Sequence, residues 1–340
     1  MSTRRVFLSG AVAAAVGAAL AACTEVEQDL PTPSAIATPS AHPALTADKL
    51  TTILERIQTG LNAADADKSP DSLVGYLTGP AARVRAEEYA IAQATGDDKF
   101  VHTFITTSQA GVAGLTTDFP RTALVVTEPA AEGEAPYLLI LTQDDARNPY
   151  QLWGWAPLRL SGQSQVPTTS TTVVGSESVS ADATGLVATP QEVLDAYIDA
   201  LNNPTGENGT AFADDTLRQR IAAERAIDLG GMGTVTVTAA AGSDGFKGLR
   251  TTANGALVMT TVTFSTVYRN TVARSTITVG GTVAKMLGDN ASVVGTVTVT
   301  YDAMVAFSIP SASEGGQSTV IGLDLVPAKA ERDDSQAPTG

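Results

Sequence analysis

The sequence predicts an α+β protein built as two tandem domains behind an export signal. In each half of the expected folded part, segments with helical periodicity come first and short β-branched segments follow. This order differs from the alternation of parallel βαβ units and favours antiparallel sheets. A Ser/Thr-rich stretch at residues 161–186 separates the halves as a linker. Because the same order stands on both sides of it, we expect an internal duplication, with two N-terminal helices on each sheet.

The first domain is expected at residues 46–160. Apolar side chains recur at the 3.6-residue period and predict a helix over 46–62. Pro80 at a helix start and Gly96 at a helix end predict a second helix over 81–95. Short segments rich in β-branched and aromatic residues then predict strands at 100–107, 122–127, 137–142 and 150–158.

The second domain is expected at residues 187–328. Thr189 and Glu192 form a capping box around Pro190, which predicts a helix start with an apolar face behind it. A second helix is expected over 214–229. The following segments predict strands at 234–239, 246–251, 257–268, 272–279, 293–307 and 320–326.

Two helices packed on a curved antiparallel sheet are also the plan of nuclear-transport-factor-like and cystatin-like domains. This resemblance implies a cone-shaped domain in each half. It implies nothing about function, because one fold hosts many activities.

Residues 1–22 have the pattern of a secretory signal peptide. Arg4 and Arg5 precede an Ala-rich apolar run that is too short to span a bilayer. Paired arginines before such a run resemble a twin-arginine signal. Residues 20–23, Leu-Ala-Ala-Cys, resemble the bacterial lipobox, and Cys23 is the only cysteine in the chain. The alternative is an ordinary signal peptide that happens to be followed by a cysteine.

The lipobox resemblance implies that the Cys23 thiol carries a diacylglycerol, with acyl chains such as palmitate. We therefore expect an exported lipoprotein held by its lipid on the outer face of the cytoplasmic membrane. Residues 23–45 are acidic and then Pro/Ser/Thr-rich, which predicts a disordered tether. A second disordered segment is expected at 329–340. Loss of the signal peptide changes the formal net charge from −15 to −17, which argues against a nucleic acid partner.

Few side chains in the body suggest chemistry. The sequence lacks zinc-binding, serine-hydrolase and nucleotide-binding motifs, so we expect no catalytic residue, no metal and no cofactor. His42 lies in the tether, where water solvates it. His102 alternates with Phe100 and Phe104 in an expected strand, which favours a partly buried structural histidine. In the alternative interpretation, His102 is the base of a hydrolase or isomerase and lines a pocket.

The candidate binding face consists of Tyr150, Trp153 and Trp155. In a strand the two tryptophans point to the same side, because side chains alternate with a period of two. They would form an aromatic wall for a ligand or partner, and in that case the rings should be exposed. The alternative is an aromatic pair that closes the core of the first domain.

Residues 148–155 read Asn-Pro-Tyr-Gln-Leu-Trp-Gly-Trp, and residues 174–177 of the linker read Val-Gly-Ser-Glu. Together with the lipobox, these motifs resemble a family of uncharacterised actinobacterial lipoproteins, a domain of unknown function. Residues 160–162 are Leu-Ser-Gly where that family has Leu-Pro-Gly. The resemblance implies placement in a Gram-positive cell envelope and no specific activity.

Three functions are compatible with these patterns. The first is a non-enzymatic lipoprotein that binds a small ligand or an envelope protein. The second is the hydrolase or isomerase that uses a cone-shaped pocket. The third is a structural or assembly module that docks a partner through the Trp153 and Trp155 face.

Overall fold

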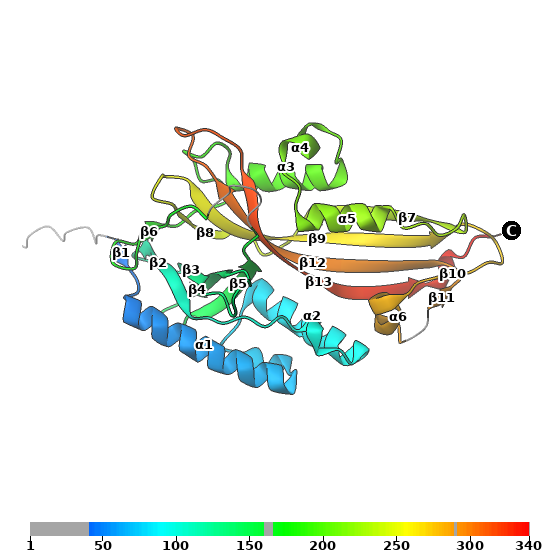
Figure 1. The fold of residues 1–340 in the computed structure, drawn as a ribbon, viewed down its shortest axis with the longest axis horizontal. Coiled ribbons are helices and arrows are strands. Elements are labelled where there is room, and N and C mark those ends of the chain that lie inside the picture. Colours follow the sequence, from blue (N-terminus) through cyan, green and yellow to red (C-terminus); the bar gives the residue numbers. More distant parts are fainter. Residues whose placement is uncertain (1–40, 160–165, 289–290, 340) are drawn as a thin grey trace, which may run out of the picture. The chain divides into compact units, whose positions relative to one another are not determined.

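The computed structural model describes residues 41–159, 166–288 and 291–339. The chain from Ser40 onward forms one compact unit. It consists of helices and antiparallel sheets, which confirms the predicted α+β class (Figure 1). The expected signal peptide with Arg4 and Arg5, the lipidation site Cys23 and most of the tether lie outside the described residues. Among the described helices, none is long and apolar enough to cross a membrane.

The first half begins with two helices, as predicted. Helix α1 (Ala47–Asp67) extends beyond the expected end at residue 62, and helix α2 (Gly79–Thr95) ends at the expected Gly96 in a left-handed conformation. A sheet follows in the order β1-β2-β3-β4-β5, with β6 parallel to β2. Its strands are β1 (His42–Pro43), β2 (Ser108–Thr116), β3 (Arg121–Thr127), β4 (Tyr137–Gln143), β5 (Gln151–Pro157) and β6 (Ser176–Glu177).

The second half also begins with helices, but one short helix, residues 281–286, lies between two of its strands. The capping box of Thr189 and Glu192 is present at the start of α3, which confirms that prediction. The helices are α3 (Pro190–Asn202), α4 (Glu207–Ala211), α5 (Thr216–Arg225) and α6 (Gly281–Met286). The main sheet has the order β13-β12-β9-β7, with β8 on β9, and a separate pair joins β10 to β11. The strands are β7 (Gly233–Ala241), β8 (Lys247–Arg250), β9 (Ala256–Asn270), β10 (Ile277–Thr278), β11 (Ser292–Val293), β12 (Thr296–Ile309) and β13 (Thr319–Asp333).

The predicted strand at 100–107 is wrong. A 3-10 turn, η2 (Asp98–Phe100), precedes a segment without strand pairing. The reason lies in α1, which binds both the backbone and the side chain of Thr106. The backbone N–H of Thr106 donates to Gln58 Oε1 at 2.8 Å, and its hydroxyl donates to the Leu54 carbonyl at 2.9 Å.

Three segments expected to be irregular are partly ordered by strand pairing. In the tether, β1 pairs with β2. In the linker, β6 also pairs with β2, and Val179 N–H donates to the Gly248 carbonyl at 3.0 Å. In the tail, β13 continues to Asp333, which lies opposite Thr296 of β12. Backbone hydrogen bonds therefore order these segments despite their polar composition.

Strand β12 is buried on both faces and connects the two halves. Met304 and Ala306 belong to a core cluster that includes side chains from the first half of the chain. Val305 and Phe307 point to the opposite face and pack with residues of α3 and α5. Because side chains alternate along a strand, the second sheet serves two cores at once.

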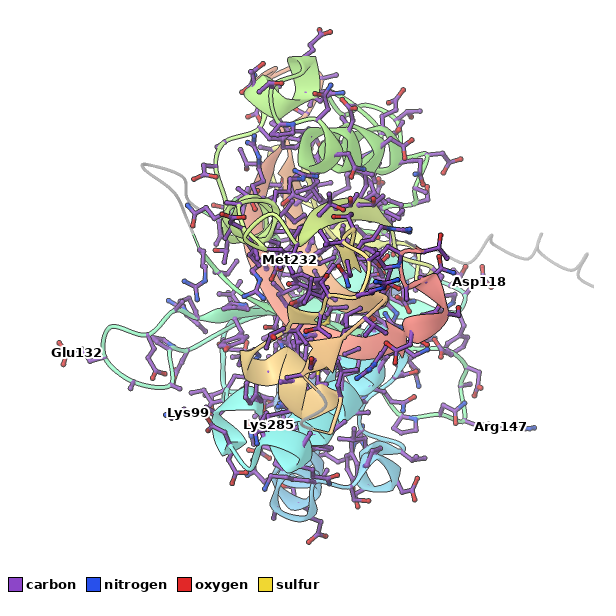
Figure 2. All side chains as sticks on the ribbon, turned by 90° about the vertical axis from the view of Figure 1, so that its right-hand side faces the viewer. Lys99, Asp118, Glu132, Arg147, Met232 and Lys285 are labelled. Atoms are coloured by element: carbon purple, nitrogen blue, oxygen red, sulfur yellow. The ribbon has the colours of Figure 1, made fainter. Side chains whose placement is uncertain are left out.

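The hairpin loops of the first sheet are exposed. Asp118, Glu132 and Arg147 lie in the loops β2–β3, β3–β4 and β4–β5, and Figure 2 shows their side chains projecting outward. Lys99, next to α2, is exposed as well. It borders the site described below.

Candidate functional site

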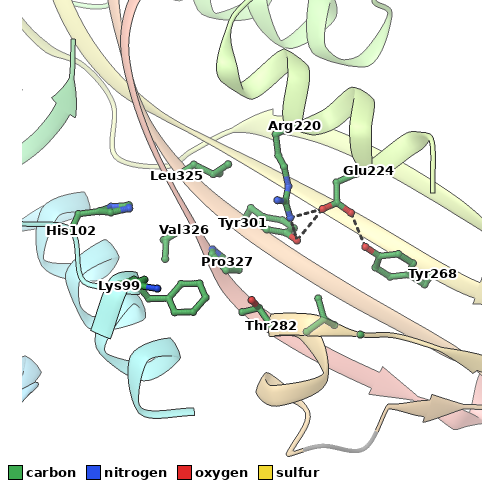
Figure 3. A pocket seen from close by; sticks show the side chains of 13 residues that line it. Lys99, His102, Arg220, Glu224, Tyr268, Thr282, Tyr301, Leu325, Val326 and Pro327 are labelled. Carbon is green, nitrogen blue, oxygen red and sulfur yellow. Dashed lines mark hydrogen bonds and ion pairs between the residues drawn. The ribbon is translucent and has the colours of Figure 1, made fainter. Parts of the chain in front are cut away.

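A cavity of about 510 Å³ lies between the end of α2, helices α5 and α6, and strands β9, β12 and β13 (Figure 3). This volume is typical of small-molecule sites. Its polar lining consists mainly of Lys99, His102, Arg220, Glu224, Tyr268 and Tyr301. Its apolar lining is formed by Phe100, Val283, Leu325, Val326 and Pro327. We call this cavity the central pocket.

One wall of the central pocket is a fixed polar group on α5. Glu224 is 4% exposed, and its Oε1 lies 2.6 Å from Arg220 Nη2. The Tyr268 hydroxyl donates to Glu224 Oε2 at 2.6 Å, and the Tyr301 hydroxyl donates to Oε1 at 3.3 Å. The Arg220 guanidinium also lies over the Tyr301 ring, 5.2 Å from its centre.

These contacts fix the protonation of the wall. Burial, followed by the hydrogen bond to Glu224, raises the pKa of Tyr268 far above its ordinary value. Burial likewise raises the pKa of Tyr301. Both phenols therefore stay protonated at neutral pH and donate hydrogen bonds to Glu224, while the Arg220 side chain is 45% exposed. The wall presents a positioned guanidinium to the pocket.

The opposite wall carries His102, which stands between two carboxylates. Its Nδ1 lies 2.9 Å from Glu88 Oε1 and 3.0 Å from Asp324 Oδ1. The neighbouring carboxylates, Asp324 first and then Glu88, raise the pKa of His102 to about 10. The side chain is 40% exposed and lines the central pocket. At neutral pH the His102 ring is therefore a protonated imidazolium, unless another cation displaces that proton.

The carboxylates are themselves held from behind. Arg85, which is fully buried, places its Nη1 2.6 Å from Glu88 Oε2. The indole Nε1–H of Trp155 donates to Asp324 Oδ2. The guanidinium of Arg85 lies over the Trp155 ring, 5.1 Å from its centre. Burial raises the pKa of Glu88, against the opposing effects of His102 and Arg85.

Local structure explains how these groups meet. Arg85 and Glu88 are three residues apart on α2 and so share one helix face. Asp324 comes from β13, which adjoins the end of β5 through the pair Leu158 and Gly322. That contact brings Trp155 of β5 to the carboxylate. Elements far apart in sequence therefore assemble the site.

The predicted binding face is not on the surface. Tyr150, Trp153 and Trp155 are 4%, 5% and 0% exposed. Strand β5 lies under α2 and against the second sheet, where Gly154 approaches Met259. The burial removes the main support for docking through exposed tryptophans and agrees with the alternative of an aromatic core pair. Trp155 takes part in the site only by holding Asp324.

The sequence missed Glu88, Asp324, Arg220 and Glu224 as site residues. Their separation along the chain hides the grouping, and no motif links them. Two weak signals in the sequence pointed toward the site. His102 is one of only two histidines, and Arg85 stands three residues before Glu88, which places both on one helix face. His102 does line a cavity, but carboxylates rather than an apolar strand face surround its Nδ1.

The model of one protein family, described as a domain of unknown function (DUF8094), matches residues 41–330. The chain belongs to this family. The match covers both halves of the fold and every residue of the central pocket. Comparison with curated proteins and with solved structures found no match. The proposals below are therefore argued from the site itself.

Proposed function

We propose that this protein is a lipoprotein of an actinobacterial cell envelope whose folded part binds a small anionic ligand in the central pocket. One observation carries the ligand class. The chain has 36 acidic and 21 basic residues, yet Lys99 and Arg220 line the pocket, and Glu224 is the single acid among the described residues of its lining. Arg220 and two tyrosines already satisfy that acid. Positive charge concentrated in an acidic protein favours an anion.

The shape of the lining restricts the ligand further. Arg220 is fixed over Tyr301, so its charge needs little reorganisation on binding. The side chain of Lys99 has no partner among the described residues, although it borders the cavity. Apolar side chains from β13, among them Leu325 and Val326, form another part of the lining. These features fit a compact molecule with one anionic end and one apolar end.

Calorimetry on the full-length protein in detergent tests this function. The probes are aryl carboxylates and aryl phosphates, each paired with its neutral amide or alcohol. Binding of an anionic probe, weakened at least tenfold by Arg220→Gln or Lys99→Gln, supports the proposal. Arg225→Gln, on the same helix but outside the pocket lining, is the matched control and should leave affinity unchanged. Equal binding of neutral probes, or no effect of either pocket variant, would contradict it.

The anchoring part of the proposal rests on the sequence motifs. A twin-arginine signal with Arg4 and Arg5 exports the folded protein, and a lipid on Cys23 holds it on the outer face of the cytoplasmic membrane. Cys23→Ser should move the protein from the membrane fraction to the soluble fraction, whereas Thr24→Ser should not. Retention of the Cys23→Ser protein in the membrane would refute lipid anchoring. Replacing both arginines by lysine should block export.

We also infer that the two halves arose by duplication and keep a cone-like plan. The support is that helices precede an antiparallel meander in each, with orders β2-β3-β4-β5 and β7-β9-β12-β13. Superposition of an experimental structure of each half on the other would test the inference. Unrelated helix placements on the two sheets would oppose it.

The second candidate function is a hydrolase or isomerase. The observation that favours it is that His102 lines the central pocket. A base role at neutral pH is disfavoured, because Asp324 and Glu88 raise the pKa of the imidazole to about 10. In such an enzyme, His102 would instead stabilise negative charge. Turnover of an envelope-derived ester or glycoside that disappears in His102→Gln would support this function over simple binding.

A further inference from the structure

Three side chains from separate elements converge at the edge of the central pocket. Glu88 comes from α2, His102 follows η2 and Asp324 comes from β13. One ligand atom of each lies within 4.8 Å of the other two, and His102 Nδ1 is 2.9 Å from Glu88 Oε1 and 3.0 Å from Asp324 Oδ1. Glu88 and Asp324 are 0% and 5% exposed, so water screens this grouping poorly.

In both Glu88 and Asp324, the carboxylate oxygen that is not paired with His102 already has a hydrogen-bond donor. Arg85 Nη1 donates to Glu88 Oε2 at 2.6 Å, and Trp155 Nε1 donates to Asp324 Oδ2. The inner oxygens are thereby turned toward His102. Donors of this kind, bonded to the far side of a ligand, orient carboxylates in metal sites.

The inner atoms are incompletely satisfied. Among the described residues, neither Glu88 Oε1 nor His102 Nδ1 has a hydrogen bond of good geometry, although both atoms are buried. Their 2.9 Å separation is close, but no N–H points along it. Asp324 Oδ1 accepts one hydrogen bond, at 3.0 Å from Leu325 N–H. A buried carboxylate oxygen without a donor is costly, and a bound cation would offset that cost.

The spacing fits a metal ion. Ligand atoms about 2.1 Å from an ion are about 3.0 Å apart at the right angles of octahedral coordination and about 3.4 Å apart in a tetrahedral site. The Nδ1–Oε1 and Nδ1–Oδ1 distances are 2.9 and 3.0 Å. The partial exposure of His102 leaves room for water or another ligand on the pocket side.

We propose that Glu88, His102 and Asp324 bind one divalent first-row transition-metal ion, of the Zn²⁺ or Mn²⁺ type. One imidazole nitrogen and two carboxylate oxygens suit these ions, whereas Ca²⁺ and Mg²⁺ prefer oxygen ligands alone. The proposal goes beyond ligand binding and does not depend on it. A metal here would add positive charge beside Lys99 and so strengthen an anion site.

Metal analysis after equilibrium dialysis is the first test. The full-length protein is stripped with EDTA and dialysed against Zn²⁺, Mn²⁺, Ca²⁺ or Mg²⁺ alone. We expect one equivalent of Zn²⁺ or Mn²⁺, with at least tenfold weaker binding in His102→Asn and Asp324→Asn. His42→Asn removes the chain's other histidine, which is exposed on β1, and should bind normally. No bound metal, or binding unchanged in His102→Asn, would overturn the proposal.

A second measurement covers the case in which the variants fail to fold. With only two histidines in the chain, imidazole NMR signals of the wild-type protein distinguish His42 from His102. Zn²⁺ should shift the His102 signals up to one equivalent and leave those of His42 unchanged. If neither shifts, or only His42 does, the site does not exist. Anion binding that fails while this metal titration succeeds would refute the proposed ligand alone.

Discussion

Replacing Arg85 by Met should destabilise the protein strongly. Arg85 and Glu88 are both fully buried, and the guanidinium lies 2.6 Å from the carboxylate. Methionine keeps apolar contact with Phe104 and Trp155 but removes the buried guanidinium that pairs with the Glu88 charge. Breaking a buried pair on one side costs about 3–5 kcal/mol. Such a loss is a large fraction of the roughly 5–15 kcal/mol by which proteins are stable.

Urea unfolding, followed by fluorescence of the two buried tryptophans, measures this loss. EDTA is present so that bound metal does not contribute. Adding Glu88→Gln to Arg85→Met should recover part of the loss, because the unpaired charge disappears. Lys329→Met breaks an exposed pair with Glu331 and should cost less than about 1 kcal/mol. A cost for Arg85→Met as small as that control, or no recovery in the double variant, would refute the reasoning.

Two further predictions concern the contact between the halves. Burial favours protonation of Asp244, but hydrogen bonds and charge from Arg83 outweigh it and hold its pKa below the ordinary 3.8. This pair therefore stabilises the fold above about pH 4, and its contribution is lost as the pH falls further. Urea midpoints from pH 6 to 2.5 should fall less steeply in Asp244→Asn than in wild type. Separately, Gly154→Ala would place a Cβ 2.6 Å from Met259 Sδ. We expect Gly154→Ala to lower the free energy of unfolding by about 1–3 kcal/mol, measured by thermal or urea unfolding. Gly280→Ala should lower it hardly at all, because among the described residues beyond its chain neighbours no heavy atom lies within 4 Å of the added Cβ. The predictions would be contradicted if the urea midpoint of Asp244→Asn fell more steeply with acid than that of wild type. Equal losses of unfolding free energy in Gly154→Ala and Gly280→Ala would also contradict them.

Local signals in the sequence were sufficient for most elements. The capping box at Thr189 and the end of α2 at Gly96 depend on neighbouring residues only, and the structure has both. The strand predicted at 100–107 failed because two residues of α1, about fifty positions away, hold Thr106: Gln58 accepts from its backbone N–H and the Leu54 carbonyl from its hydroxyl. Secondary-structure propensity depends on neighbouring residues and therefore cannot predict a partner so far away in the sequence.

The tryptophan motif also separates what local sequence predicts from what tertiary packing decides. Alternation predicts Trp153 and Trp155 on one face, but it cannot anticipate the register shift in the pairing of β4 with β5 at Trp153, nor say whether water or protein covers that face. The answer came from β5 packing under α2 and against the second sheet, which buries both rings. Exposure is a tertiary property, and so a binding face cannot be assigned from residue type alone.

By itself, the sequence determined the α+β class, the order of helices before strands and the acidic balance of the chain. It also carries the lipobox pattern at Cys23, from which the anchoring proposal follows. Only the tertiary structure brought Glu88, His102 and Asp324 to within 4.8 Å and set Arg220 on the opposite wall of one cavity. The reason is physical. Helix periodicity and caps act over a few residues, whereas the site depends on how α2, α5 and β13 pack against each other.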